Sequence, residues 1–175
     1  EKANIVDLCR EVFNAFREFA QQHRIDYQFI SPTENLVSWF DPDKIEKILY
    51  NLLSNAFKFT PDGGSIQLKI AHDHAGVLDA LTAQERRVHI SVRDNGIGIS
   101  SGRQAKIFDR FYKIRSDSSH LKKRIEHDGA GIGLAYSREL AEMHRGSIQV
   151  QSEEGVGSTF TVSLPIGSRI KAVTA

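Results

Sequence analysis

Cysteine is almost absent from this sequence, since Cys9 is the only one among 175 residues. A single cysteine excludes an internal disulfide and a zinc site built from several thiolates. No apolar run approaches the roughly 20 residues that a transmembrane helix needs. An excess of one charge is also lacking: 23 Lys and Arg face 22 Asp and Glu, which leaves a net charge of +1. The sequence therefore has no overall field that favours nucleic acid or an anionic membrane surface, and we expect no nucleic-acid partner.

The composition is that of an ordinary globular protein. Hydrophobic residues make up 40% of the chain and charged residues 26%, so a chain of this length can build a real core. Residues 1–166 are expected to form one domain, and residues 167–175, which have little pattern, a C-terminal tail. Because the chain begins with Glu1 rather than methionine, we expect it to be part of a longer protein.

Apolar residues recur at the spacing of an amphipathic helix in three segments, namely residues 4–23, 42–60 and 131–144. Asp41 and Pro42 are typical of an N-cap and a first helical turn, and the run TPDGG (60–64) ends the second helix. Residues 104–112 (QAKIFDRFY) predict a further short helix held by aromatic side chains.

Five segments have the alternation of β-strands: residues 25–31, 65–72, 86–94, 147–153 and 158–165. The piece LVSWF (36–40) is short and apolar. The connection 73–85 is long for a hairpin, and we expect it to be exposed. Residues 114–128 are polar, charged and aperiodic, which predicts a mobile loop. Together these elements predict an α+β two-layer sandwich, with three main helices on one face of a sheet of about five strands.

Three polar residues of the second helix share one face, because Asn51, Asn55 and Lys58 stand at i, i+4 and i+7. An amide oxygen can ligate Mg²⁺, which usually takes only one or two ligands from a protein. A lysine supplies a point charge to phosphate oxygens. The row therefore suits a phosphate-bearing ligand with its metal. A solvated helix face explains the same pattern about equally well.

The third helix begins in a glycine-rich stretch, DGAGIGLA (128–135), with Gly129, Gly131 and Gly133 at its mouth. A helix N-terminus offers unpaired N–H groups to an anion, and glycine lets the ligand approach the backbone closely. The spacing matches neither G-x-x-x-x-G-K-[ST] nor G-x-G-x-x-G, which argues against a P-loop protein and a Rossmann domain. An ordinary glycine-rich turn remains the alternative.

A carboxylate ends the strand HISVRD, where Asp94 is followed by Asn95-Gly96-Ile97-Gly98. Glycines beside it would let a flat ring approach, and the carboxylate could accept a hydrogen bond from an exocyclic amine such as that of adenine. A lone Asp-x-Gly is usually only a turn. The combination with the amide row and the glycine-rich helix start favours a nucleotide site.

Five motifs in order resemble the catalytic and ATP-binding domain of bacterial sensor histidine kinases, within the wider family of gyrase, heat-shock chaperone and mismatch-repair ATPases. NLLSNAFKFTPDGG resembles the N box, DNGIGI the first glycine box, IFDRFYK the F box, GAGIGLA the second glycine box and GVGSTF the third; they span most of residues 41–163. The resemblance implies a Bergerat-type α/β sandwich with a mixed sheet, and ATP bound between the helices and a mobile lid.

The resemblance also implies residue roles around Mg²⁺ and ATP. On the phosphate side, Asn55 would coordinate Mg²⁺ with Asn51 beside it. The phosphates would be contacted by Lys58 and Lys113 and held by Gly129, Gly131 and Gly133. Two further ATP-binding residues would be Ile132 and Leu134. Lys113 falls where many relatives carry an arginine. On the adenine side, Asp94 would bind the amine, and the pocket would be shaped by Phe59, Gly96, Gly98, Ile99 and Tyr112. Phe108, Phe111 and Tyr112 would anchor the lid, and Thr159 would support Asp94.

One position helps to distinguish phosphoryl transfer to a protein from hydrolysis of ATP. Relatives that hydrolyse ATP resemble each other in having a glutamate where this chain has Asn51, and an amide cannot act as a general base at neutral pH. We therefore expect a domain that presents ATP to another domain's nucleophile, and an independent ATPase is disfavoured. A neutral histidine is already nucleophilic. A nucleotide-gated interaction module, which binds ATP without phosphotransfer, remains the alternative.

The partners implied by the resemblance are the protein's own dimerisation domain with its acceptor histidine, and the receiver domain of a response regulator. The full-length protein would be a homodimer. This domain would face the cytoplasm, in a family whose members are often anchored in a membrane.

Overall fold

Five strands form one mixed sheet in the computed structural model, which describes residues 1–73, 86–113 and 131–166. The strands lie in the order β2-β4-β5-β7-β6, with β2 parallel to β4 and all other neighbours antiparallel. Their bounds are β2 Asp26–Ile30, β4 Ser65–His72, β5 Arg87–Asp94, β6 Ser147–Glu153 and β7 Gly157–Pro165. All five segments predicted as strands are confirmed.

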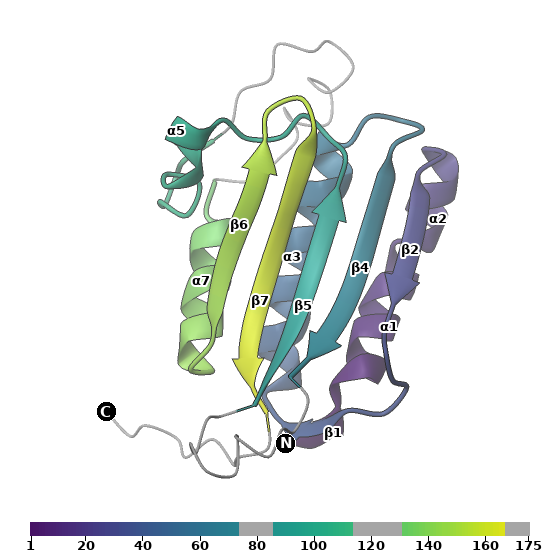
Figure 1. Cartoon of the computed structure of the whole chain (residues 1–175), viewed down its shortest axis with the longest axis vertical. Helices are drawn as coiled ribbons and strands as arrows, with labels where there is room; N and C mark the ends of the chain where they lie inside the picture. Colours follow the sequence, from purple (N-terminus) through teal and green to yellow (C-terminus); the bar gives the residue numbers. More distant parts are fainter. Residues whose placement is uncertain (74–85, 114–130, 167–175) are drawn as a thin grey trace.

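Helices cover one face of this sheet, as Figure 1 shows. The three main ones are α1 (Ile5–Ala15), α3 (Pro42–Phe59) and α7 (Gly133–Met143). The predicted α+β sandwich of two layers is therefore confirmed. The start of α3 is also as predicted, because the Asp41 side chain accepts a hydrogen bond from Lys44 N and Pro42 occupies the first turn.

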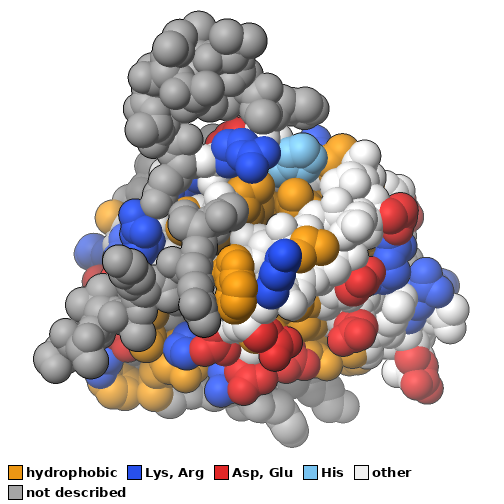
Figure 2. Space-filling model, turned by 90° about the horizontal axis from the view of Figure 1, so that it is seen from below, with side chains coloured by type: hydrophobic (Ala, Val, Ile, Leu, Met, Phe, Trp, Pro, Cys, Tyr) orange, Lys and Arg blue, Asp and Glu red, His pale blue; other side chains and the backbone are white. Residues whose placement is uncertain are grey.

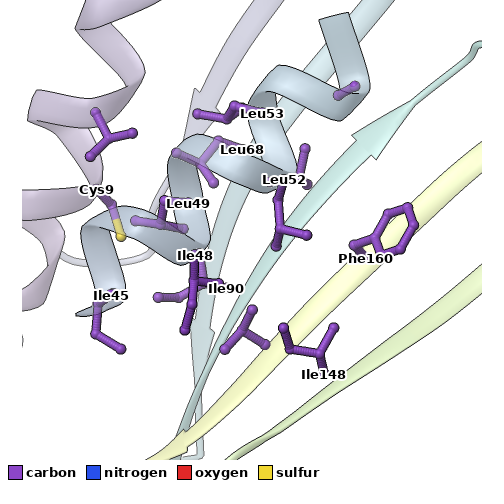
Figure 3. Packing of buried hydrophobic residues seen from close by; sticks show 14 of the residues in the cluster. Cys9, Ile45, Ile48, Leu49, Leu52, Leu53, Leu68, Ile90, Ile148 and Phe160 are labelled. Atoms are coloured by element: carbon purple, nitrogen blue, oxygen red, sulfur yellow. The ribbon is translucent and has the colours of Figure 1, made fainter. Parts of the chain in front are cut away.

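The core lies between α3 and the sheet. Figure 3 shows Leu49, Leu52 and Leu53 of α3 on the side that meets Leu68 and Ile90 of the strands. These five side chains are at most 1% exposed, and burying each contributes about 1.5–3 kcal/mol. Since the apolar stripe of α3 is used here, its polar row is turned elsewhere.

Cys9 also belongs to this core, on α1. Its burial raises the pKa of the thiol to about 12, so the thiol stays neutral at physiological pH. The residue packs as a small apolar side chain.

The single helix predicted for residues 4–23 is wrong in one respect, because α1 ends at Ala15 and a separate helix, α2 (Arg17–Gln22), follows. At the break, Phe16 N donates to Phe13 O three residues earlier, which tightens the turn. The break lets Phe16 stack on Phe57 of α3 with ring centroids 5.3 Å apart. Tertiary packing of aromatic rings thus overrides the uninterrupted helical pattern.

One further segment differs from the prediction, and another, for which no element was predicted, contains a strand. Residues 104–112 are not a helix: a four-residue helix, α5 (Ser101–Gln104), precedes a series of tight turns. The piece 36–40 contains a strand, β3 (Val37–Trp39), which pairs antiparallel with β1 (Lys2–Asn4) in a second, two-stranded sheet. Neither strand has enough residues for alternation to identify it.

Several expectations fall on residues outside the described part of the chain. These are the exposed connection within 74–85, the mobile loop 114–128 and the tail 167–175. None of the helices in the described part of the chain is both long enough and apolar enough to cross a bilayer. At the end of the molecule seen in Figure 2, acidic and basic side chains both occur beside hydrophobic ones.

Tyr27 supplies a test of the core. Its ring stacks on Phe13 at 3.9 Å between centroids, and its buried hydroxyl has no hydrogen-bond partner among the described residues. Tyr27→Phe keeps the ring and removes a desolvated hydroxyl, so the free energy of unfolding should rise by about 1 kcal/mol. Urea denaturation measures this, with Tyr50→Phe, at an exposed tyrosine, as the control that should change nothing. A clear loss of stability in Tyr27→Phe would show that the hydroxyl is hydrogen-bonded.

Candidate functional site

One cavity of about 310 Å³ brings together most of the residues singled out in the sequence. It is bounded by the polar face of α3, the end of β5 with the loop after it, β7 and the start of α7. The expected site residues that line it are Asn51, Asn55, Lys58, Phe59, Asp94, Gly98, Ile99, Tyr112, Lys113, Gly131, Ile132, Gly133 and Leu134. Segments more than 80 residues apart in the chain therefore share one pocket.

Asp94 is inside because of strand alternation. Val88, Ile90 and Val92 of β5 face the helices, and Asp94 continues that series at the end of the strand. The residue is 7% exposed. Desolvation raises the pKa of its carboxyl to about 6, although backbone N–H groups of Gly96 and Ser158 hydrogen-bond to it and favour the charged form.

The glycines after Asp94 allow a tight return of the chain. Gly96 does not line the cavity but supports it: its N–H donates to Asp94 Oδ1 at 2.9 Å, and a Cβ there would lie 2.4 Å from Phe59 O. Ile97 N donates to Phe59 O at 3.3 Å. The loop is thus fastened to the C-terminal end of α3.

Thr159 is expected to support Asp94, and that role stays a prediction. Thr159 lies on the opposite face of β7, and Ser158, which pairs with Asp94 in the sheet, lines the cavity instead. Side chains alternate along a strand, so a shift of one residue moves a side chain to the other face. Gly129, a further expected phosphate contact, lies outside the described residues.

Six lining residues were not identified in the sequence: Ser54, Ala56, Ile97, Ile107, Ser158 and Phe160. Ile97 stands inside the DNGIG motif and Phe160 follows from the alternation of β7, so these two had a usable signal, whereas Ser158 needed the register of β7 against β5. Ile107 stands inside the IFDRFYK motif, but turns rather than the predicted helix place it at the cavity.

The opposite end of the cavity is formed by α3 and the start of α7. Asn51 Nδ2 donates to Ser137 Oγ at 2.6 Å. A Cβ on Gly133 would lie 2.3 Å from Asn51 Oδ1, so this glycine lets the two helices meet. Asn51 and Phe59 are eight residues apart on α3, which is about 12 Å along the axis. The cavity therefore has an acidic end near Phe59 and an amide end near Asn51.

The segment before residue 114 closes one side of the cavity. Phe108 is buried against Phe160 in an edge-on contact with centroids 6.4 Å apart, and the Arg138 guanidinium lies 4.7 Å from the centre of its ring. Phe111 differs from the expectation of an anchoring ring, because its side chain is 70% exposed at a φ of +68°. Its backbone makes the contact instead: Phe111 N donates to Gly131 O at 2.9 Å.

The donor set of the cavity restricts the cation that it could hold. Within residues 1–73, 86–113 and 131–166, no three His, Cys, Asp or Glu residues form a metal-binding group. Zinc and calcium, which need several protein ligands, find no such set among the residues that the structure describes. Mg²⁺ fits, since it keeps most of its ligands as water and phosphate oxygens and could take one amide oxygen from Asn55 or Asn51. Lys58 and Lys113 line the same cavity and suit phosphate.

Comparison with known families gives one match over most of the chain. The profile described as histidine kinase-, DNA gyrase B-, and HSP90-like ATPase matches residues 40–168. The chain is 36% identical over 166 residues to histidine kinase P4 of Formosa agariphila, which covers 95% of this chain and 11% of that protein. It is 34% identical over 165 residues to the sensor histidine kinase WalK of Bacillus subtilis, covering 94% of this chain and 24% of WalK. The chain thus spans less than a quarter of the length of these relatives.

Two solved structures are similar to the fold. The nucleotide-free catalytic domain of the histidine kinase ThkA superposes with a TM-score of 0.73 at 25% identity, covering 95% of this chain and 96% of that one. Full-length ShkA in complex with AMPPNP superposes with a TM-score of 0.72 at 26% identity, covering 99% of this chain and 32% of ShkA.

Proposed function

Because this chain belongs to the family of histidine kinase-, DNA gyrase B- and HSP90-like ATPases, we propose that it is the catalytic domain of a sensor histidine kinase. It binds Mg·ATP in the cavity between α3, α7 and the end of β5. It then donates the γ-phosphoryl group to a histidine on a separate dimerisation domain. The observation that supports this most is the two-ended cavity, with a buried carboxylate at one end and an amide row at the other.

The acidic end suits adenine. Asp94 can accept a hydrogen bond from the exocyclic amine, which is unlike a phosphate in being a donor. Phe59, Ile99 and Tyr112 line the same cavity and supply apolar surface for the ring. The structure of ShkA with AMPPNP, an ATP analogue, agrees with nucleotide binding by this fold.

The amide end suits the triphosphate with its cation. In this proposal Asn55 contributes an oxygen to Mg²⁺, and Lys58 and Lys113 neutralise phosphate charge. The N-terminus of α7 directs its unpaired backbone N–H groups towards phosphate oxygens. Gly131 lies just before this helix and Gly133 is its first residue. Ile132 and Leu134 line the wall beside these glycines.

Phosphoryl transfer to a protein side chain is favoured over hydrolysis of ATP, because no described residue of the cavity is placed to act as a general base for water. Among the described residues that line the cavity, Asp94 is the one carboxylate, and it is assigned to adenine. Asn51 cannot take a proton from water at neutral pH. Catalysis then rests on positioning the γ-phosphoryl group and neutralising its charge.

The partners in this proposal are a dimerisation domain of the same protein, which carries the acceptor histidine, and the receiver domain of a response regulator. The full-length protein would be a homodimer, with this domain in the cytoplasm. The chain covers 11% of histidine kinase P4 and 24% of WalK, which supports the part of this proposal that places further domains in the same protein.

A transfer assay tests the proposal. The chain is mixed with radiolabelled Mg·ATP and the dimerisation domain of a sensor histidine kinase, and the label on that domain is followed in acid and in base. Phosphohistidine, which is labile in acid and stable in base, is the expected product. Tight nucleotide binding without any labelled histidine would favour the nucleotide-gated interaction module instead.

Asp94→Asn is expected to weaken ATP binding by about 1–3 kcal/mol, roughly 5- to 150-fold, because a charged acceptor is lost.

The same carboxylate makes ATP binding depend on pH. With a pKa of about 6, Asp94 becomes protonated as the pH falls from 7 to 5, and the affinity for ATP should fall with it. Calorimetric titration at both pH values measures this. The Asp94→Asn variant should lose the part of the pH dependence centred near 6.

The contribution of Asp94 to stability should depend on pH in the opposite direction to its contribution to ATP affinity. The folded pKa of about 6 exceeds the ordinary 3.8, so the folded state binds the proton more tightly than the unfolded state. The contribution of Asp94 to the free energy of unfolding therefore decreases as the pH rises from 3.8 to 6. At pH 7 the free energy of unfolding of Asp94→Asn should therefore be no lower than that of the parent. An ATP affinity that is unchanged in the folded variant would refute the assignment of Asp94 to adenine.

A further inference from the structure

A buried serine on α7 holds one of the amides of the cavity. Ser137 is 1% exposed, and its Oγ accepts a hydrogen bond of 2.6 Å from Asn51 Nδ2. Ser137 lies one helical turn after Gly133, on the same side of α7. Ser137 does not itself line the cavity, whereas Asn51 and Gly133 do. It therefore reaches the site only through Asn51.

Gly133 is the second residue of α7 that packs against the Asn51 amide. A Cβ at position 133 would lie 2.3 Å from Asn51 Oδ1 and 2.8 Å from Asn51 Nδ2, so the amide lies flat against the glycine. The oxygen rests at the N-terminal end of α7, where the helix dipole favours negative partial charge. The nitrogen points along α7 to Ser137. The two atoms of the amide are thus assigned to different neighbours.

This orientation decides what Asn51 offers to a ligand. One N–H of its nitrogen is engaged with Ser137, which leaves the oxygen and the second N–H as the polar groups that a ligand in the cavity could meet. An amide oxygen attracts a hard cation or a water molecule bound to it, and it repels phosphate oxygens. Reversal of the amide would present N–H donors, which have the opposite preference.

We propose that Ser137 is a positioning residue that fixes the Asn51 amide with its oxygen towards the cation that accompanies ATP. The inference rests on the proposed binding of Mg·ATP and assigns to Asn51 a part in holding Mg²⁺ or its water shell. Without the hydroxyl, a partly buried N–H of Asn51 loses its acceptor and the amide is no longer held in one orientation. Residues that orient a metal ligand typically change metal affinity 10- to 100-fold when they are replaced.

Two substitutions of Ser137 that introduce side chains of equal shape separate the effect of losing the hydroxyl from the effect of changed packing. Ser137→Thr keeps the hydroxyl and adds a methyl group, while Ser137→Val has the same size and no hydroxyl. Ser137→Ala removes the hydroxyl without adding bulk, for the case in which valine disturbs α7. The readouts are calorimetric affinity for AMPPNP without metal, and the Mg²⁺ concentration that gives half of the metal-dependent gain in affinity. Circular dichroism checks that each variant is folded.

The expected result is specific to the cation. Ser137→Val and Ser137→Ala should need about tenfold more Mg²⁺ than the parent, with metal-free affinity within about twofold. Ser137→Thr should behave as the parent. A parental Mg²⁺ requirement in the valine and alanine variants would overturn the inference, as would equal losses with and without metal in all three variants. In both cases the parent still binds Mg·AMPPNP and the proposed function stands, whereas failure of the parent to bind would contradict both.

Discussion

Asn55→Ala is expected to lower phosphoryl transfer by at least about 100-fold while leaving the protein folded. Asn55 stands on α3 and is partly exposed at the wall of the cavity, and alanine is favourable in a helix. The substitution removes the amide that is proposed to hold Mg²⁺ at the phosphates. Losing one group that stabilises charge in a transition state typically costs 100- to 1,000-fold. The measurement is the initial rate of histidine labelling at saturating Mg·ATP.

A matched control is available on the same helix. Lys47 is exposed and does not line the cavity, so Lys47→Ala should keep the parental transfer rate. Urea denaturation of both variants separates a loss of chemistry from a loss of structure. A folded Asn55→Ala protein that transfers at the parental rate would remove Asn55 from the metal site.

Gly98→Ala is expected to lower the free energy of unfolding by about 2–5 kcal/mol. Gly98 has a φ of +67°, a conformation that costs a side-chain-bearing residue about 1–2 kcal/mol. In addition, a Cβ there would lie 1.9 Å from Glu153 O, a backbone atom that cannot swing away. Forcing two backbone segments apart costs about a further 1–3 kcal/mol. Chemical denaturation measures the total.

Gly155 separates these two costs. It also has a positive φ, of +82°, but a Cβ there would meet nothing within 4 Å. Gly155→Ala should therefore cost only the conformational part, about 1–2 kcal/mol. Equal losses for both variants would mean that the contact between the loop after β5 and the turn between β6 and β7 is not close.

That contact explains why the loop after β5 has two glycines rather than an ordinary turn. Gly98 presses against the turn that joins β6 and β7, and Gly155 N donates to Ile97 O at 2.7 Å. The Phe59 end of α3 holds the other side of the loop through Ile97 N. The acidic end of the cavity is therefore built by three segments that are distant in the chain.

Local patterns were sufficient for much of the fold and the site. The polar row Asn51, Asn55 and Lys58 could be predicted because a helix of known start repeats every 3.6 residues. The burial of Asp94 follows in the same way from the alternation of β5. In both cases one regular element places the residue, and no distant contact is needed.

Other features depended on tertiary contacts. The exchange of Thr159 for Ser158 needed the register of β7 against β5, which pairs Asp94 with Ser158. The break at Phe16 needed the ring of Phe57 on another helix. Ser137 stands 86 positions from Asn51, and a serine in a helical stripe gives no sign of such a partner.

The most direct test of the account is a crystal structure of this chain grown with AMPPNP and Mg²⁺. We expect the adenine amine within hydrogen-bond distance of Asp94, and the phosphates beside Asn55 and the start of α7. The analogue bound at another surface, or bound in this cavity with its phosphates at Asp94, would contradict it.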